Sequence, residues 1–286
     1  MISASKYQAY GNDFLILVDG PSAPDRQADL SRGLCDPHFG VGADGCVYLE
    51  PHESKSVRFR IFNQDGSEAG MSGNGVRCAA AFLHNKRIVT SKEIHFDTAA
   101  GRRTLSLLQS RYPVWEYRAA MGPPRFRPSE IPMRVDGVPN PPRVIDHQLR
   151  VADRSVSVTA LSVGNPQCVV FLEEPVTDED FAVLGPGLST HPDFPEGTNV
   201  SFVEVLDRSR VRARIWERGV GPTHSSGTGC CGAAVAALVK GRVMNPVRVQ
   251  TETGTQLVDW TEGTEIFLTG EARFIADVRF EWEASQ

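Results

Sequence analysis

Two short stretches, SGNG at residues 72–75 and SGTG at residues 226–229, decide the fold that this sequence predicts. They stand 154 residues apart (226 − 72), and each precedes a run of small apolar residues, VRCAAAFL or CCGAAVAAL. Alanine-rich composition over about three to four turns predicts a helix after each stretch. Each predicted helix begins behind a serine, which is chemically inert unless a neighbouring group activates it.

Predicted strands surround both helices. Alternating or β-branched runs bounded by turn residues are typical of strands, and they occur in VRFRIFN, VTALSV, QCVVFL, VSFVEV, VRARIW, VRVQ and QLVDW. The stretch from Gly122 to Pro142 is dense in proline and glycine, which predicts the passage between two domains. Each half then holds several strands and one helix opened by Ser-Gly-x-Gly. This order predicts an α/β chain of the α+β type with two pseudo-symmetric domains, each a mostly antiparallel sheet around a central helix.

Composition and charge limit the function classes. The chain has 286 residues, 41% apolar and 23% charged, with a net charge of −5. No basic face for nucleic acid or a membrane surface is evident. The apolar run FLILV near the N-terminus is too short for a signal peptide or a membrane span, so we expect a cytoplasmic protein. The six cysteines lack C-x-x-C spacing and are expected to be buried small hydrophobes.

The sequence contains no convincing motif for a cofactor or a metal. GVGADG at residues 40–45 matches G-x-G-x-x-G, but no apolar strand precedes it and the strand-like CVYLE follows it. A dinucleotide site needs a strand before the loop and a helix after it. The seven histidines show no metal-ligand spacing, and no lysine lies in a motif for a pyridoxal Schiff base. We therefore expect neither a metal nor a cofactor.

The Ser-Gly-x-Gly stretches suit an anion site. The first turn of a helix has unpaired N–H groups and a partial positive charge, and glycine permits close approach of a ligand. Two such helix ends could hold an amino-acid carboxylate while a base removes the α-proton and an acid returns it. The alternative is that both serines are only helix N-caps, for which serine is favoured. The repetition, once in each half, favours a shared site.

The sequence resembles the diaminopimelate epimerase family. The resemblance lies in YGNDFLIL, FGVGADG, FNQDGSEAGMSGNGVRC, VGNPQCVVF, GTNVSFVEV and IWERGVGPTHSSGTG, in this order. It implies a cofactor-independent interconversion of LL- and meso-diaminopimelate, with the active site in a cleft between two domains. It also implies that the C-terminal strand, about residues 273–286, returns to the first domain at residues 1–120, leaving 121–272 as the second.

The resemblance also implies the residues of the site. Two catalytic positions fall on Ser72 and Ser226. Backbone N–H groups would hold the carboxylate at the reacting end, from Gly73, Asn74, Gly227 and Thr228. Side chains would read the amino and carboxylate groups at the other end of the substrate, from Asn12, Asn63, Asn165, Asn199, Glu217 and Arg218. An arginine fork matches a carboxylate bidentately.

The chain departs from the family at the positions of proton transfer. The family has cysteines where this chain has Ser72 and Ser226, a histidine where it has Gln167, and usually a glutamate where it has Pro222. A thiol pKa near 8.5 can be lowered at a helix N-terminus, whereas a serine hydroxyl needs a partner base. His224 is the one histidine near Ser226, and it is either that base or an exposed loop residue. Cys78 and Cys230 are expected to face the packed sides of their helices.

Three origins of the serines stay open: engineering, natural divergence, or loss of catalysis with binding retained. We expect binding of a diaminopimelate-like amino acid and turnover roughly 10²–10⁴ below that of a cysteine pair. The alternatives are a lyase or isomerase of the same superfamily acting on another amino acid, and an inactive binding homologue. The sequence also leaves open whether the chain forms a homodimer, as family members often do.

Overall fold

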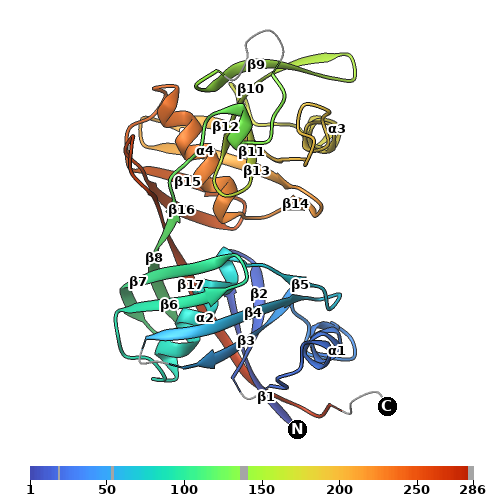
Figure 1. Ribbon diagram of the computed structural model, residues 1–286, viewed down its shortest axis with the longest axis vertical. Coiled ribbons are helices and arrows are strands. Elements are labelled where there is room, and N and C mark those ends of the chain that lie inside the picture. Colours follow the sequence, from blue (N-terminus) through green and yellow to red (C-terminus); the bar gives the residue numbers. More distant parts are fainter. Residues whose placement is uncertain (19, 53–54, 136–140, 283–286) are drawn as a thin grey trace. The chain divides into compact units, whose positions relative to one another are not determined.

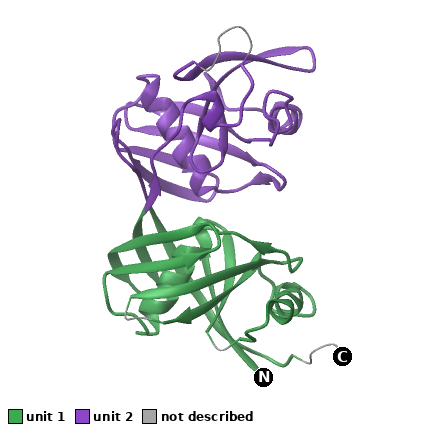
Figure 2. Cartoon of the chain, in the orientation of Figure 1, with its two compact units in different colours: residues 1–119, 269–286 green, residues 120–268 purple. Residues whose placement is uncertain are grey.

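A computed structural model describes residues 1–18, 20–52, 55–135 and 141–282. By contacts the chain divides into two compact units, residues 1–119 with 269–286 and residues 120–268 (Figure 2). Of the linker expected between Gly122 and Pro142, residues 136–140 lie outside the described residues, as do residues 283–286 of the expected C-terminal strand. The described part of this linker holds a 3-10 turn at Pro128–Glu130.

The elements of unit 1 follow one another along the first part of the chain (Figure 1). They are β1 (Ile2–Ala9), β2 (Asn12–Leu17), α1 (Pro24–Cys35), β3 (Gly45–Pro51), β4 (Ser56–Asn63), β5 (Glu68–Ala69), α2 (Gly73–Asn85), β6 (Glu93–Thr98), β7 (Gly101–Arg111) and β8 (Val114–Gly122), whose last residues belong to unit 2. The last strand of the chain, β17 (Ile266–Phe280), begins in unit 2 and pairs with β1 in unit 1.

From β10 onwards, unit 2 repeats the order of elements that unit 1 has from β1. It contains β9 (Val144–Val151), β10 (Arg154–Ser162), β11 (Pro166–Leu172), α3 (Asp178–Ser189), β12 (Asn199–Asp207), β13 (Arg210–Glu217), β14 (Gly221–Thr223), α4 (Gly227–Val239), β15 (Val247–Thr251) and β16 (Gly254–Asp259). The predicted α+β class, with strands predominating, is confirmed.

Strand pairing shows that the two units are built alike. In unit 1, β1–β2 is antiparallel, β2–β3 parallel, β3–β4 antiparallel, β4–β6 parallel and β6–β7 antiparallel. In unit 2, β10–β11, β11–β12, β12–β13, β13–β15 and β15–β16 follow the same alternation. The short strands β5 and β14 pair with β4 and β13 in turn. The duplication inferred from two tetrapeptides thus extends over the strands, their order and their directions.

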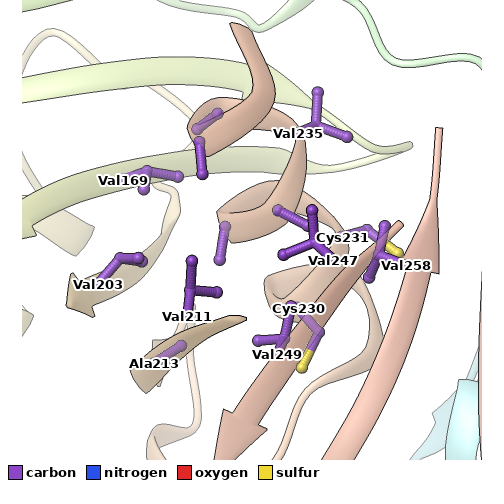
Figure 3. Close-up of a cluster of buried hydrophobic side chains, with 14 of the residues drawn as sticks. Val169, Val203, Val211, Ala213, Cys230, Cys231, Val235, Val247, Val249 and Val258 are labelled. Atoms are coloured by element: carbon purple, nitrogen blue, oxygen red, sulfur yellow. The ribbon is translucent and has the colours of Figure 1, made fainter. Parts of the chain in front are cut away.

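The Ala-rich helices α2 and α4 are the central elements of their units. Nine residues of α4, from Gly229 to Ala237, are buried, as are ten of α2. A helix that is apolar all round is stable only when it is enclosed on all sides. α4 accordingly packs against strands β10 to β13, β15 and β16. Figure 3 shows its cysteines and Val235 among valines of these strands, such as Val203 and Val247.

Two further helices, α1 and α3, were not among the helices that the sequence predicted. α1 begins with Pro24 at its first turn and buries Leu30, Leu34 and Cys35 on one face. α3 begins behind Thr177, whose hydroxyl accepts a hydrogen bond from the Asp180 N–H at 3.1 Å. α1 is polar on its outer face, and α3 contains Gly185, Pro186 and Gly187, which are unfavourable within helices, so both lack the alanine-rich signal of α2 and α4. Among the described residues, no helix is both long and apolar enough to span a bilayer.

Candidate active site

The two serines that open Ser-Gly-x-Gly have nearly the same geometry. Ser72 has φ −131° and ψ 124°, and Ser226 has φ −135° and ψ 126°. The Gly75 N–H donates to Ser72 Oγ at 3.1 Å, and the Gly229 N–H donates to Ser226 Oγ at 3.3 Å. Both serines therefore cap helices, α2 and α4 respectively. A cap uses the hydroxyl oxygen as acceptor, so each O–H proton is still available to another partner.

The second glycine of each motif is required by packing. A Cβ added at Gly75 would lie 3.1 Å from Ile61 Cδ1 and 3.2 Å from Ser72 Cβ. A Cβ added at Gly229 would lie 2.9 Å from Ile215 Cδ1 and 3.2 Å from Ser226 Cβ. Ile61 lies in β4 and Ile215 in the corresponding strand β13. Each glycine thus lets a serine sit close to a strand isoleucine.

Substituting Gly229 by alanine is expected to lower the free energy of unfolding by about 1–3 kcal/mol, the usual cost of overpacking a core. Urea denaturation measures this change. Gly70→Ala is the control, since its nearest neighbour would be Ala100 Cβ at 3.7 Å, an ordinary contact. Equal stability of the Gly229→Ala variant and the native chain would contradict the packing argument.

In unit 1 the predicted residues Asn12 and Asn74 come together. Asn74 Nδ2 donates to Asn12 Oδ1 at 3.3 Å, and Asn12 Nδ2 donates to Asp44 Oδ2 at 2.6 Å. The buried Arg77 donates to Asn74 Oδ1. Asp44 and Arg77 were not predicted, although both lie within the motifs that carry the resemblance. Their hydrogen bonds fix the amide orientations at the start of α2.

Asn63 lies apart from this network, at the end of β4. Its side chain donates to Ser67 Oγ at 2.9 Å, and its N–H donates to the Ser67 carbonyl at 2.9 Å.

The Ser72 hydroxyl has the Gly75 N–H as its hydrogen-bond partner in unit 1. Within the described residues of unit 1, no carboxylate or histidine is hydrogen bonded to Ser72.

In unit 2 Asn165 and Thr228 repeat the contact between Asn12 and Asn74. Asn165 Nδ2 donates to Thr228 Oγ1 at 3.4 Å, next to the start of α4. Gln167 supports this arrangement, because its Nε2 donates to Asn165 Oδ1 at 2.8 Å. The Gln167 side chain is fully buried and lies against α4 at Gly232, where an added Cβ would be 3.0 Å away. It therefore positions Asn165 and is not hydrogen bonded to Ser226.

Asn199 and Arg218 form a second polar group in unit 2. The Arg218 N–H donates to Asn199 Oδ1 at 2.8 Å, and Arg218 Nη1 donates to the Glu196 carbonyl at 2.7 Å. The stem of Arg218 runs over Gly197, where a Cβ would come within 3.0 Å of its Cδ. The contact with the Glu196 carbonyl orients the guanidinium of Arg218. Because Arg218 is also exposed, its guanidinium can bind an anion.

Glu217 lies beside Ser226. The Ser226 side chain lies close enough to the Glu217 carboxylate to lower, by itself, the pKa of Glu217. Burial of this carboxylate raises the pKa more strongly, so that the net pKa lies above its usual value. The Ser226 Oγ accepts from the helix N–H of Gly229 at 3.3 Å. The resemblance groups Glu217 with Arg218 as a substrate contact, and in the structure its carboxylate lies near Ser226.

Glu217→Gln is expected to stabilise the fold increasingly as pH rises. A raised folded-state pKa means that folding favours the protonated carboxyl, so this contribution is present at low pH and is lost as pH rises through the folded pKa. Glutamine resembles the protonated acid. The unfolding free energy of Glu217→Gln minus that of the native chain should be near zero at low pH and positive at neutral pH. Urea titrations at several pH values, with Glu252→Gln as control, measure it, and a difference that shrinks as pH rises would contradict the assignment.

His224 is turned away from Ser226. Its Nδ1 lies 2.8 Å from Glu252 Oε2, and its side chain is 72% exposed. His224 is therefore an exposed loop residue and not a base for Ser226.

Cys78 and Cys230 are fully buried, and burial raises the pKa of the Cys78 thiol. The Cys78 thiol therefore offers no thiolate at the start of α2.

One buried residue near Ser226 was not found from the sequence. Gln256 in β16 is fully buried, and its Nε2 donates to Ser225 Oγ at 3.0 Å and to Cys230 Sγ at 3.4 Å. In the sequence, the only indication of this residue was a glutamine within the strand pattern QLVDW. Gln256 holds the residue preceding Ser226 in place. In the described ranges, no cluster of three or more His, Cys, Asp or Glu side chains is arranged to bind a metal.

Known proteins agree with the resemblance seen in the sequence. Residues 4–127 and 159–275 match the family model described as diaminopimelate epimerase. The chain belongs to the diaminopimelate epimerase family. Diaminopimelate epimerase of Desulforudis audaxviator is 42% identical, over 96% of this chain and 97% of the relative. That of Pelotomaculum thermopropionicum is 41% identical, over 94% and 95%.

Solved structures show the same fold in more distant proteins. A hydroxyproline epimerase of Agrobacterium vitis superposes with a TM-score of 0.66 at 15% identity, covering 97% of this chain and 90% of the other. At this identity the likeness concerns the fold alone.

Proposed function

We propose that this chain is a cofactor-independent amino-acid epimerase of the diaminopimelate epimerase type, with Ser72 and Ser226 at the two positions of proton transfer. The observation that carries this proposal is the pair of capped helix starts, each a serine with the same backbone geometry and each beside an asparagine network. Names of relatives at about 40% identity over nearly the whole chain support the substrate.

The helix starts supply binding groups for a carboxylate. The N–H groups of Gly73 and Asn74, and those of Gly227 and Thr228, lie in the first turns of α2 and α4, where N–H groups have no partner within the helix. Together with the partial positive charge of a helix N-terminus, they stabilise the negative charge that develops when the α-proton leaves. We assign them to the reacting end of the substrate.

The exposed guanidinium of Arg218 suits the second carboxylate of diaminopimelate. The Asn199 side chain and the Glu196 carbonyl hold Arg218 in place. We assign Asn12, Asn63, Asn165 and Asn199 to substrate contacts that read the second amino-acid head. Such a head distinguishes diaminopimelate from a smaller amino acid.

The proposal also covers the setting of the reaction. Conversion of LL- to meso-diaminopimelate belongs to the biosynthesis of lysine and peptidoglycan precursors, and we place it in the cytoplasm. The proposed chemistry uses groups of this chain alone. A homodimer is the expected assembly, and light scattering after size exclusion tests it.

A second candidate function is an amino-acid-binding protein without catalysis. The observation that favours it is Ser72, which has no carboxylate or histidine bonded to it among the described residues of unit 1. The same superfamily could also catalyse elimination or isomerisation on an amino acid with a β- or γ-hydroxyl group.

Incubation with LL-diaminopimelate in deuterated water tests the proposed function. Proton NMR follows loss of the α-proton signal, and chiral chromatography follows the meso product. Exchange together with meso product supports the epimerase. Calorimetric binding without any exchange would favour the binding protein, and absence of both would refute the proposed function.

A further inference from the structure

The start of α2 differs from the start of α4 by one buried charge. Arg77 lies in the second turn of α2 and is 1% exposed. The residue 154 positions further on (231 − 77), the interval that also separates the two serines, is Cys231, which is buried in the second turn of α4. A guanidinium stays protonated in proteins. Unit 1 therefore has a buried cation where unit 2 has a thiol.

The guanidinium of Arg77 lies against the first turn of its own helix. Side chains of a helix point back towards its N-terminus, so a residue in the second turn reaches the first. Arg77 Nη2 donates to Asn74 Oδ1, and Arg77 Nη1 lies 4.0 Å from the position of a Cβ added at Gly73. The positive charge is therefore held beside the two residues whose N–H groups are assigned to the substrate carboxylate.

Tyr10 and the strand β17 enclose this guanidinium within unit 1. Arg77 Cζ lies over the Tyr10 ring, 5.6 Å from its centroid. The Tyr10 hydroxyl accepts a hydrogen bond from the Glu271 N–H at 3.0 Å, which holds the ring in place. A Cβ added at Gly270 would lie 3.1 Å from the Tyr10 ring and 3.4 Å from Arg77 Nε, so this glycine leaves room for both. The position of the charge is thus fixed from two sides.

The hydrogen bonds that leave Arg77 all run in one direction. Arg77 donates to Asn74, Asn74 Nδ2 donates to Asn12 Oδ1 at 3.3 Å, and Asn12 Nδ2 donates to Asp44 Oδ2 at 2.6 Å. A cation at one end and a carboxylate at the other therefore fix which way both amides are turned. Each amide nitrogen has a second N–H beyond the one used in this chain. The start of α2 thus offers N–H groups and a positive charge, which suit a carboxylate.

The fold alone does not favour a cation at this place. The N-terminus of a helix has a partial positive charge, so acidic residues are favourable there and cations are favourable at the other end. The first turn of α2 nevertheless has no acidic residue. Burial raises the pKa of the Cys78 thiol, and the charge of Arg77 opposes this rise, so the charge acts within α2. A bound carboxylate offsets the repulsion between the arginine and the helix end.

We infer that Arg77 is a positioning residue for the substrate carboxylate: it orients the Asn74 side chain and holds a positive charge beside the N–H groups of Gly73 and Asn74. This inference rests on the proposed function, which assigns those N–H groups to the reacting end of the substrate. It adds that the start of α2 binds this carboxylate more strongly than the start of α4, because Cys231 has no cationic group.

Calorimetric titration with LL-diaminopimelate tests this role. Arg77→Met should raise Kd by about 10–100-fold, since hydrogen bonds and contacts to charged groups contribute strongly to binding. Arg77→Lys keeps the charge and should recover part of the affinity. Arg77→Gln keeps a donor for Asn74 Oδ1 without the charge, so its Kd should stay close to that of Arg77→Met. Cys231→Ala, at the same position of α4, is the matched control and should leave Kd unchanged.

The order of the variants separates this role from a purely structural one. Urea denaturation of each variant gives its stability, and a structural role would make affinity follow stability whatever the charge at position 77. An Arg77→Gln variant that binds as tightly as Arg77→Lys would overturn the inference, and this comparison holds even where Arg77→Met does not fold. Unchanged Kd in a folded Arg77→Met variant would also overturn it and leave the proposed function standing. A native chain that neither binds diaminopimelate nor exchanges its α-proton would refute the proposed function itself.

Discussion

Replacing Ser72 and Ser226 together by cysteine is expected to raise the turnover of LL-diaminopimelate by roughly 10²–10⁴-fold. Both serines cap helices with their Oγ close to a helix N-terminus, which is where a thiol pKa is lowered toward neutrality. A serine hydroxyl gains no useful ionisation there. Stopped assays with chiral separation of the two stereoisomers give the turnover of both proteins under the same conditions.

Ser225→Cys is the matched control for the double variant. Ser225 is buried next to Ser226 but is held by Gln256. A thiol at this position should not raise turnover, because it does not cap α4. A double variant no faster than the native chain would contradict the assignment of the two serines to proton transfer.

Arg218→Ala is expected to raise KM for diaminopimelate by about 10–100-fold, since hydrogen bonds to a charged partner contribute about 1.5–3 kcal/mol. The guanidinium is exposed and already oriented by Asn199 and the Glu196 carbonyl. Arg218→Lys keeps the charge but loses the planar fork, so it should recover only part of the affinity. Initial rates over a range of substrate concentrations separate KM from turnover.

Arg210 in unit 2 provides a matched control for Arg218. Arg210 is also exposed and is paired with Asp207 at 2.6 Å. Arg210→Ala should leave KM within about twofold, because surface ion pairs contribute little. Equal effects of the two substitutions on KM would contradict a specific role for Arg218.

The sequence allowed the duplicated architecture to be predicted because Ser-Gly-x-Gly has a local cause. The serine of each tetrapeptide caps the helix that follows, and its second glycine avoids a clash with Ile61 or Ile215. Both tetrapeptides therefore mark helix starts. Strands β12 and β13 were likewise evident from the runs VSFVEV and VRARIW. Helix α1 was missed because its apolar residues cover only one face of a short polar segment, and helix α3 because it contains Gly185, Pro186 and Gly187, which are unfavourable within helices.

Side-chain partnerships were harder to predict than elements. Glu217 and Arg218 are adjacent, and a sequence cannot show that the first lies near Ser226 while the second contacts the Glu196 carbonyl. His224, two residues from Ser226, was considered either as a base for Ser226 or as an exposed loop residue, and the structure pairs it with Glu252. These contacts depend on which strands become neighbours, and that is decided by the fold as a whole.

The steady-state turnover of LL- to meso-diaminopimelate by the native chain tests the central claim most directly, namely that this epimerase scaffold moves protons with serines. Typical enzymes turn over about 10 times per second. A loss of 10²–10⁴-fold for the missing thiol pair predicts about 10⁻³–10⁻¹ per second. A turnover near 10 per second would contradict this account, because serines would then serve as well as cysteines.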